Sequence, residues 1–543
     1  MLNPHEHYVI GLDFGTDSVR SLLVDAADGR EISAAVVPYP AWREGRYCDP
    51  TSHQFRQHPQ DHLTSMRECV SACLAAAGTA VRRRIRAISV ASTGSTPIAV
   101  DGNGKPLALS EQFQEDPDAM FLLWKDHSAV SEAAEINAHA RIWKKPYLDY
   151  VGGVYSPEWY WAKLLHILRR SKTLRLHCRG FVEHCDWIPF LLTGGRNVGS
   201  LRRSVCAAGH KALWADAHGG YPDPAFFRDL DPLLYPFVFE SAHPVYTADQ
   251  PAGVLCREWA ECWQLPESTL VGIGALDAHI GAVGAQIEPF VLSKVMGTST
   301  CDMLVVPAGD RPARPVPGIC GLVRGSILPG MIGMEAGQSA FGDVYAWFRD
   351  VLAWPLKHSG LDDAATEKII PALACAAEGL PLSEHSELAL DWFNGRRTPG
   401  ANPLLTGAIT GLTLASDPPR LFRSLVEATA FGARSIVDHF SAEKVPVRGV
   451  IATGGIAHKS PYVMQTVADV LGLPVRVNRS VQTAALGAAM FAATVAGCYP
   501  RVQDAMAAMG RGFDPPYEPD PARKALYHRR YTKYLQIGAF VEN

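Results

Sequence analysis

Two short turns rich in glycine and hydroxyl side chains are the segments of this sequence best suited to binding phosphate. One is Asp13-Phe14-Gly15-Thr16-Asp17-Ser18 and the other is Gly297-Thr298-Ser299-Thr300. Turns of this kind present backbone N–H groups and hydroxyls to phosphoryl oxygens. Asp13 adds a carboxylate placed for a water-bridged Mg²⁺, an ion that keeps several waters and takes few protein ligands. Either turn alone is more typical of an ordinary hairpin, but two of them favour a nucleotide site.

A third glycine-bearing segment has a predicted strand, 450–453, that runs into Gly454-Gly455 ahead of a predicted helix. Glycines there let the backbone approach a phosphate or a flat ligand closely, although a plain strand-to-helix turn has the same pattern. The sequence has no G-x-x-x-x-G-K-[ST] loop and no G-x-G-x-x-G after a strand. The protein-kinase motifs are missing as well. These absences exclude a P-loop and leave a Rossmann-type loop and a protein kinase without support.

The elements that must position the turns follow from the apolar pattern. Residues 8–15, 18–25 and 31–37 alternate as strands joined by tight turns, which predicts an antiparallel meander at one edge of a sheet. A helical pattern at 57–80 and a strand at 85–90 come next. The alternation of helix and strand that follows predicts α/β layers.

The same layout of strand, polar turn and strand starts again near residue 291. Residues 291–296 and 301–306 flank the second turn as 8–15 and 18–25 flank the first. A chain of 543 residues is too long for one compact core. We therefore expect two related domains, with the boundary near 285–290.

Composition narrows the class of protein. The 51 basic and 55 acidic residues give a net charge of −4, so no bulk field attracts nucleic acid. The 12 cysteines include no C-x-x-C pair, which favours free thiols in a reducing compartment. The first residues lack a signal-peptide pattern, and no apolar run approaches the ~20 residues that span a bilayer. We expect a soluble, cytoplasmic protein without nucleic-acid or membrane partners.

The three glycine-bearing segments resemble the nucleotide elements of the FGGY carbohydrate kinases. Longer stretches resemble the ribulokinase branch of that family; they include residues 92–97, 123–127, 155–159, 208–211, 333–343 and 391–397. The likeness covers about residues 8–500. Departures are few: Met296 stands where a branched aliphatic residue is usual, and the tail after about 505 is uninformative. The resemblance implies an α/β fold of two actin/Hsp70/hexokinase-like (ribonuclease H-like) domains around a central cleft.

The resemblance also implies roles for particular residues. It places the catalytic base at Asp277, which could also be a helix N-cap. His279, two residues on, is better interpreted as an ordinary packed or capping histidine. The implied sugar contacts are Thr96, Lys211, Asp277 and Glu335. The implied nucleotide-binding residues are Asp13, Gly15, Thr16, Ser18, Gly297, Thr298, Ser299, Gly454 and Gly455.

The function implied is ATP-dependent phosphorylation of the 5-hydroxyl of L-ribulose in L-arabinose degradation, with Mg²⁺. A kinase for another ketopentose or pentitol (D-ribulose, xylulose or ribitol) is the nearest alternative, because one or two hydroxyl contacts decide between such sugars. A non-catalytic sugar- or nucleotide-binding regulator is a further alternative, and a homodimer is one expected assembly. We expect an N-terminal domain at 1–287, a C-terminal domain at 288–505 and a helical tail at 506–543.

Overall fold

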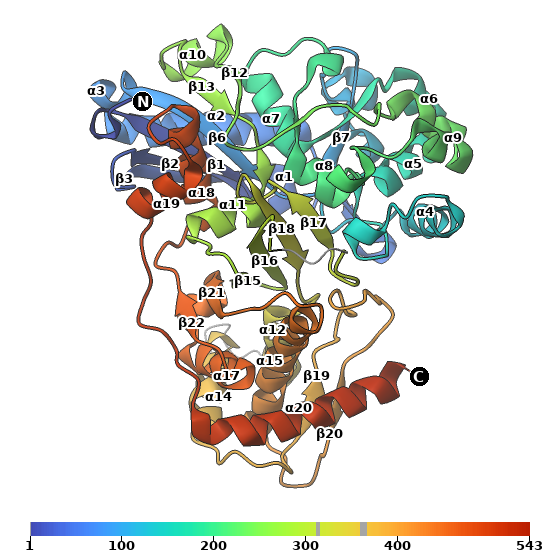
Figure 1. Ribbon diagram of the computed structural model, residues 1–543, viewed down its shortest axis with the longest axis vertical. Coiled ribbons are helices and arrows are strands. Elements are labelled where there is room, and N and C mark those ends of the chain that lie inside the picture. The colour runs from blue at the N-terminus through green and yellow to red at the C-terminus, as the bar shows by residue number, and fades with distance from the viewer. Residues whose placement is uncertain (1, 311–314, 359–365, 543) are drawn as a thin grey trace.

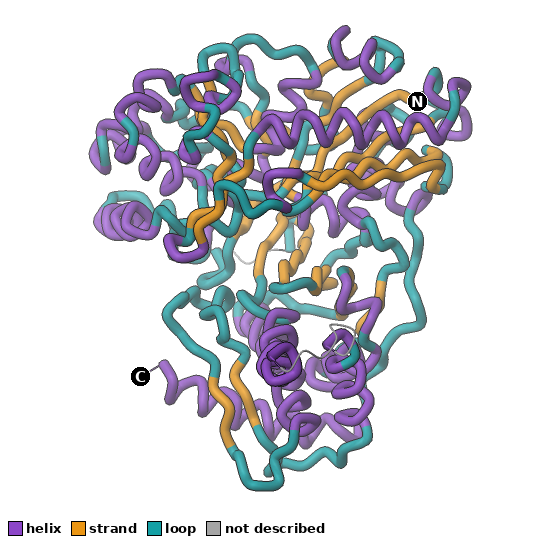
Figure 2. Tube along the Cα trace, turned by 180° about the vertical axis from the view of Figure 1, so that it is seen from behind, coloured by secondary structure: helices purple, strands orange, loops and turns teal. Residues whose placement is uncertain are grey.

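The computed structural model describes residues 2–310, 315–358 and 366–542. Two mixed sheets form the centres of two lobes, which lie one above the other in Figure 1. We call the elements packed around each sheet the first lobe and the second lobe. Figure 2, from behind, shows that the C-terminal helix lies at the end of the molecule remote from the N-terminus.

The first sheet has the order β12-β13-β6-β1-β2-β3, with β14 also paired to β6. Its strands β1, β2 and β3 are antiparallel, as predicted, while β6 is parallel to β1, and β13 and β14 are parallel to β6. The strands are β1 (Tyr8–Phe14), β2 (Ser18–Asp25), β3 (Glu31–Pro38), β6 (Ile85–Ser92), β12 (Pro251–Val254), β13 (Leu270–Gly272) and β14 (Ala275–Leu276).

The second sheet repeats this plan. Its order is β17-β18-β16-β15-β21-β22, with β15, β16 and β18 antiparallel and β21 parallel to β15. The strands are β15 (Val291–Met296), β16 (Thr300–Pro307), β17 (Gly321–Arg324), β18 (Met331–Ala336), β21 (Gly449–Thr453) and β22 (Val475–Val477). The repeat expected from the two strand–turn–strand segments is therefore present in the sheet topology.

Helices cover both sheets, and the predicted helix at 57–80 is α2. In the first lobe they are α1 (Pro40–Arg43), α2 (Pro59–Ala77), α3 (Thr79–Arg82), α4 (Val130–Ile142), α5 (Tyr160–Arg170), α6 (Lys172–His177), α7 (His184–Leu192), α8 (Val205–Lys211), α9 (Pro224–Leu230) and α10 (Arg257–Trp263). In the second lobe they are α12 (Gly342–His358), α14 (Ile369–Glu378), α15 (Pro418–Ala442), α16 (Gly455–Lys459), α17 (Pro461–Leu471) and α20 (Pro521–Glu542). Short strands complete the lobes: β4 (Cys48–Asp49), β5 (Gln54–Gln57), β7 (Pro97–Val100), β8 (Phe121–Leu122), β9 (Gly180–Glu183), β10 (Arg203–Ser204), β11 (Val245–Tyr246), β19 (Leu388–Leu390) and β20 (Ala408–Thr410).

Two helices cross at the junction of the lobes, α11 (Asp277–Gly284) and α18 (Thr483–Val495). Glycine lets their backbones touch, since a Cβ built on Gly487 would lie 2.0 Å from the Ile280 carbonyl oxygen. α18 also packs on β1 and β6, and α19 (Val502–Met509) packs on α18, so both red helices lie beside the blue strands in Figure 1. α18, which falls within the expected domain at 288–505, therefore packs on the first sheet, and α19 crosses the end of that range.

Two further expectations concern the chain as a whole. All 12 cysteines lie in the described residues and are free thiols. No helix among the described residues is both long enough and apolar enough to cross a bilayer.

Candidate active site

The register of the first sheet brings three sequence-distant segments to one edge. Phe14 pairs with Ser92, and Leu276 also pairs with Ser92, in parallel strands. The residues that follow or end these strands therefore share the carboxyl edge, where α/β proteins bind ligands. Asp13 is the second-last residue of β1, and Asp277 comes directly after β14.

Asp13 is buried at the start of the first turn. Arg20 Nη1 donates to Asp13 Oδ2 over 3.2 Å, and the N–H of Gly15 donates to the Ser18 carbonyl over 2.9 Å to close the turn. Burial raises the pKa of Asp13 although Arg20 opposes that shift. The side-chain hydroxyl of Ser18 donates to Asp17 over 2.8 Å.

Thr16 is held by two side chains from outside the turn. Its hydroxyl accepts from Trp124 Nε1 over 3.0 Å, and its carbonyl accepts from Gln57 Nε2 over 2.6 Å. Gln57 is itself fixed, because its Oε1 lies 3.1 Å from His62 Nε2. A side-chain amide that neither motif nor spacing identified thus fixes the first turn.

The second turn joins β15 to β16 and exposes Gly297 and Thr298. A neighbouring segment supports it: the N–H groups of Phe341 and Asp343 donate to the Thr298 carbonyl over 2.8 and 3.1 Å. The N–H of Gly342 donates to the Gly297 carbonyl over 3.1 Å. The turn's own carbonyls are therefore occupied, while its exposed side remains available to a ligand.

The third segment reaches the second. Gly454 has a φ of +89°, and a Cβ built on it would lie 2.7 Å from the Met296 carbonyl oxygen. Since that φ and that contact both require glycine, Gly454 lets β21 end against the start of the second turn. Gly455 follows as an exposed residue with no atom within 4 Å of an added Cβ. The structure therefore brings Gly297, Gly454 and Gly455 together.

Asp277 is half-buried and is the first residue of α11. The N-cap is Leu276, which corrects the expectation that Asp277 could occupy that position. Its Oδ1 accepts from the Ala278 N–H over 2.7 Å. Burial and the charge of Asp13 raise the pKa of Asp277 to about 7. A carboxyl with that pKa is suited to accept a proton near neutral pH.

Lys211 and Glu335 form a buried ion pair between the lobes. Lys211 Nζ donates to both carboxylate oxygens of Glu335, over 3.1 and 3.0 Å. Lys211 ends α8, Glu335 lies on β18, and Lys211 Nζ lies 5.4 Å from the centre of the Trp159 ring. Burial disfavours the charged form of both residues, but the charge of the partner has the larger effect. The pKa of Lys211 is therefore raised and that of Glu335 is lowered.

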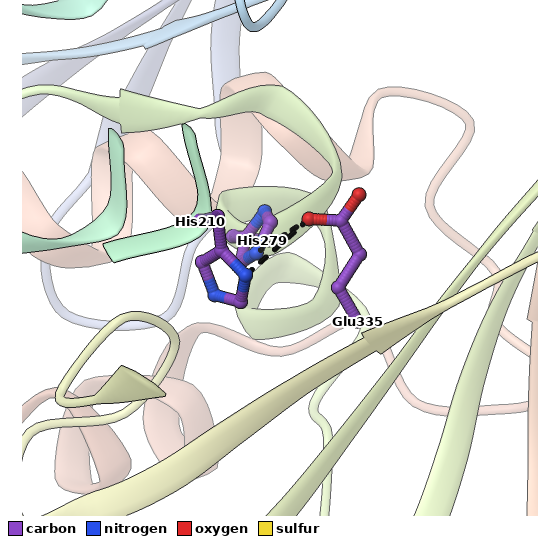
Figure 3. Close-up of side chains that lie close together, drawn as sticks. All are labelled: His210, His279 and Glu335. Atoms are coloured by element: carbon purple, nitrogen blue, oxygen red, sulfur yellow. Dashed lines mark ion pairs between the residues drawn. The ribbon is translucent and has the colours of Figure 1, made fainter. Parts of the chain in front are cut away.

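Two histidines lie beside the Glu335 carboxylate (Figure 3). His210 Nδ1 and His279 Nε2 lie 3.4 and 3.7 Å from the same oxygen, Glu335 Oε2, and the two rings are 4.4 Å apart at their centres. Burial lowers the pKa of His279 to about 4, and burial also lowers the pKa of His210 well below its usual value, so both rings are neutral at pH 7. His279 is a packed histidine, as the sequence predicted.

The three donors of Figure 3 lie within 4.8 Å of one another, a spacing that a transition-metal ion could use. The ammonium of Lys211, however, already occupies both oxygens of Glu335 and would repel a cation. Two imidazoles are also poor ligands for Mg²⁺, which prefers oxygen. We interpret the histidines as side chains packed against the Glu335 carboxylate and not as metal ligands.

Thr96 stands apart from the other predicted sugar contacts. It is fully buried, its hydroxyl lies 3.0 Å from that of Thr93, and its N–H donates to Glu183 Oε2 over 2.9 Å. Its loop does adjoin Asp277, because a Cβ on Gly94 would lie 2.0 Å from Leu276 Cδ2. The described contacts therefore place the loop at the site and turn the Thr96 hydroxyl toward the loop itself.

A second contact between the lobes was missed by sequence reasoning. Glu158 lies 2.8 Å from His127 Nε2 and 3.9 Å from Arg397 Nη2 of the second lobe. Burial alone would raise the pKa of Glu158, but the hydrogen bond with His127 and the charge of Arg397 have a larger, opposite effect and lower it to about 2. Both residues fall in the stretches 155–159 and 391–397 that resemble the family, and that likeness was the available signal.

Comparison with known proteins agrees with this geometry. Residues 292–496 match the C-terminal domain of the FGGY family of carbohydrate kinases. The chain is 46% identical over 550 residues to a ribulokinase of Vibrio parahaemolyticus, covering 100% of this chain and 97% of the relative. It is 35% identical to a ribulokinase of Bacillus licheniformis, covering 96% and 95%.

Solved structures share the fold. A xylulose kinase from Rhodospirillum rubrum superposes with a TM-score of 0.79 at 22% identity, covering 99% of each chain. A glycerol kinase from Plasmodium falciparum, solved with ADP, superposes with a TM-score of 0.76 at 16% identity, covering 98% of each chain. The predicted two-domain actin/hexokinase-like α/β fold is confirmed. This chain belongs to the FGGY family of carbohydrate kinases.

Proposed function

We propose that the protein transfers the γ-phosphoryl group of ATP to the 5-hydroxyl of L-ribulose, giving L-ribulose 5-phosphate in L-arabinose degradation. The observation that carries the proposal is the identity, across the whole chain, to relatives named ribulokinase. Two features suit such a transfer. Asp277 has a raised pKa and can act as a base, and the buried ion pair of Lys211 and Glu335 offers polar groups to the sugar.

In this proposal Asp277 is the proton acceptor. The ionised carboxylate takes the proton of the sugar hydroxyl as that oxygen bonds to phosphorus. A pKa of about 7 makes Asp277 a stronger base than an ordinary carboxylate while leaving much of it ionised at neutral pH. Lys211 and Glu335 orient the ketose by hydrogen bonds to its hydroxyls, and the Thr96 loop bounds the pocket.

The nucleotide would lie between the turns. We assign its phosphates to Asp13, Gly15, Thr16 and Ser18 on the first lobe and to Gly297, Thr298 and Ser299 on the second, with Gly454 and Gly455 beside the nucleoside. This assignment is supported by the exposed glycine and hydroxyl groups of the second and third segments, which meet at Met296.

The carboxylates fit a Mg²⁺ ion. The charge of Asp13 raises the pKa of Asp277, an unfavourable pairing that a nearby dication would relieve. Carboxylate oxygens are ligands that Mg²⁺ prefers, and we propose that Asp13 holds the ion through water. When bound, the ion would neutralise charge on the phosphates.

We propose that the chain has an N-terminal domain at 1–287, a C-terminal domain at 288–505 and a helical tail at 506–543. The two sheets support this division, with α18 and α19 packed across it. We also propose a cytoplasmic location, which suits 12 free cysteines. A homodimer is the assembly to test by light scattering.

Release of ADP from Mg²⁺-ATP tests the activity, measured with L-ribulose, D-ribulose, D-xylulose and ribitol. Fast release with L-ribulose and little with the others is the expected result. Fast release with another sugar would keep the reaction class and replace the substrate. Sugar binding by calorimetry with no release would instead favour a non-catalytic regulator.

A further inference from the structure

We propose that the C-terminal helix α20 holds the second turn in shape, and that Tyr534 is its positioning residue. The proposal rests on the nucleotide role proposed above for Gly297, Thr298 and Ser299. α20 runs along the end of the second lobe in Figure 1, and neither motif nor resemblance gave this tail a role.

A continuous line of buried hydrogen bonds joins Tyr534 to the turn. The Tyr534 hydroxyl donates to Asp391 Oδ1 over 2.7 Å, and Asp391 Oδ2 accepts from Gln338 Nε2 over 2.8 Å. The N–H of Gln338 donates to Thr300 Oγ1 over 2.9 Å, and the Gln338 carbonyl accepts from the Thr300 N–H over 3.0 Å. Thr300 directly follows Ser299, so the line ends on the turn.

The amide of Gln338 can satisfy its neighbours in only one orientation. Its Oε1 accepts from Lys294 Nζ over 2.9 Å, while its Nε2 donates to Asp391 and to the Thr429 carbonyl over 2.9 Å. A cation on one side and an anion on the other fix the direction of the amide. Lys294 is in turn paired with Asp302 over 2.8 Å, and all these side chains are buried.

The hydrogen bond between Gln338 and Asp391 lies directly against the backbone of α15. A Cβ built on Gly432 of α15 would lie 2.1 Å from Asp391 Oδ2 and 2.5 Å from Gln338 Nε2. Gly432 therefore permits the contact between Gln338 and Asp391, which lie in the segments 333–343 and 391–397 that resemble the family.

Gln338 also begins the segment that supports the turn from its other side. Phe341, Gly342 and Asp343 donate N–H groups to the carbonyls of Gly297 and Thr298. A shift of Gln338 therefore disturbs the turn at both ends. Since an unsatisfied member of a buried polar network is costly, loss of the Tyr534 hydroxyl should allow Asp391 and Gln338 to move.

The first experiment compares Tyr534→Phe with Tyr531→Phe in the full-length enzyme. Tyr531 lies on the same helix, with its ring 6.0 Å from that of Tyr534, and its hydroxyl lies outside the line of bonds. We expect Tyr534→Phe to raise KM for Mg²⁺-ATP about fivefold while KM for the ketose stays within about twofold. Tyr531→Phe should change neither.

Hydrogen exchange at residues 297–301 separates a local effect on the second turn from a general loss of stability, which would speed exchange throughout the lobe. Tyr534→Phe should speed exchange in that peptide and leave β21 unchanged. Asp391→Leu should do the same more strongly, because it removes both oxygens that accept from Tyr534 and Gln338. Unchanged exchange in both variants, or equal effects in Tyr531→Phe, would overturn the proposal.

Thr298→Val separates this proposal from the nucleotide role of the turn. If it weakens ATP use while Tyr534→Phe speeds exchange, both stand. If Thr298→Val leaves KM for ATP unchanged, the nucleotide assignment of the turn fails, whatever exchange shows about α20.

Discussion

At the scale of single residues, the environment of Asp277 favours proton transfer at a cost in the stability of the fold. Burial and the charge of Asp13 raise its pKa from 3.8 to about 7. A carboxyl with a raised pKa binds more protons in the folded than in the unfolded state, so it lowers stability as pH rises from about 4 to 7. Activity needs the ionised form, whereas the fold favours the protonated form.

Replacing Asp277 by Asn should therefore have opposite effects on turnover and stability. We expect ADP release to fall by at least about 100-fold, since a general base contributes about 10²–10⁴-fold. The melting temperature relative to the unsubstituted protein should rise as pH increases from 4 to 7, because Asn carries no charge to bury. Sugar binding measured by calorimetry should persist. Undiminished turnover would contradict the assignment of the base.

The pH dependence of the unsubstituted enzyme gives an independent check. kcat/KM for the ketose should rise with an apparent pKa near 7 and fall about tenfold per unit below it, because the carboxylate must be ionised. Initial rates from pH 5.5 to 9 at constant ionic strength measure this profile. A flat profile between pH 5.5 and 8 would show that Asp277 has an ordinary pKa or is not the base.

Substituting Lys211 or Glu335 alone should destabilise the protein more than substituting both together. Lys211→Met or Glu335→Gln leaves one buried charge unpaired, which should cost about 3–5 kcal/mol in the free energy of unfolding. Lys211→Met combined with Glu335→Leu should recover part of that stability but no ketose binding. Glu261→Gln is the control, because its pair with Arg257 is exposed and should contribute little. Full ketose binding by the double variant would remove both residues from the sugar site.

Some of these residues could be predicted and others could not. Resemblance identified Asp277, Lys211 and Glu335, although the last two are 124 positions apart in the sequence. Gln338 and His210 belong to stretches that resemble the family, yet no pattern gave either a role. A single amide or imidazole in an apolar segment acquires its function from neighbours that only folding supplies.

At the scale of elements, the crossing of α11 and α18 is the contact most dependent on glycine. The Gly487 Cα faces the Ile280 carbonyl, and a Cβ on Gly284 would lie 1.9 Å from the Thr483 carbonyl oxygen. Backbone atoms cannot move aside as a flexible side chain can. The crossing also positions Asp277, which is the first residue of α11.

Gly487→Ala should consequently destabilise the protein by at least about 2 kcal/mol, the usual effect of overpacking a close contact. Urea unfolding measures the change. Gly102→Ala is a matched control, since an added Cβ there has no atom within 4 Å. Equal stability of the two variants would show that the helices can separate at little cost.

The hairpins were predictable because alternation and tight turns are local, and β1, β2, β3, β15 and β16 all lie where expected. The return of α18 to the first sheet was not. Its sequence is Ala-rich on every side, and 10 of its 13 residues are buried, so no polar face indicates which sheet it covers. That choice is made by close packing against Gly11, whose added Cβ would lie 1.8 Å from the Ala485 carbonyl oxygen.

At the scale of the whole molecule, the first turn and the second turn lie on different lobes. We expect sugar and nucleotide together to close the lobes and exclude water from the phosphate, which limits ATP hydrolysis. Small-angle scattering should show a smaller radius of gyration with L-ribulose and a non-hydrolysable ATP analogue than with either alone. An unchanged radius would argue against closure.

The ion pair between Lys211 and Glu335 restricts how such a motion can occur. α8 also packs directly on β17, where a Cβ on Gly209 would lie 2.4 Å from Val323 Cγ1. Separating the lobes at this end would break a close apolar contact and leave two buried charges unpaired, whereas Gly297, Thr298 and Gly455 at the turns of the second lobe are exposed. The rotation axis should therefore pass near α8 and β17, and phosphorylated sugar would leave by the same opening as ADP. The path by which both products leave would thus be set by the position of one buried charge pair, and product-inhibition patterns would show whether one product must leave before the other.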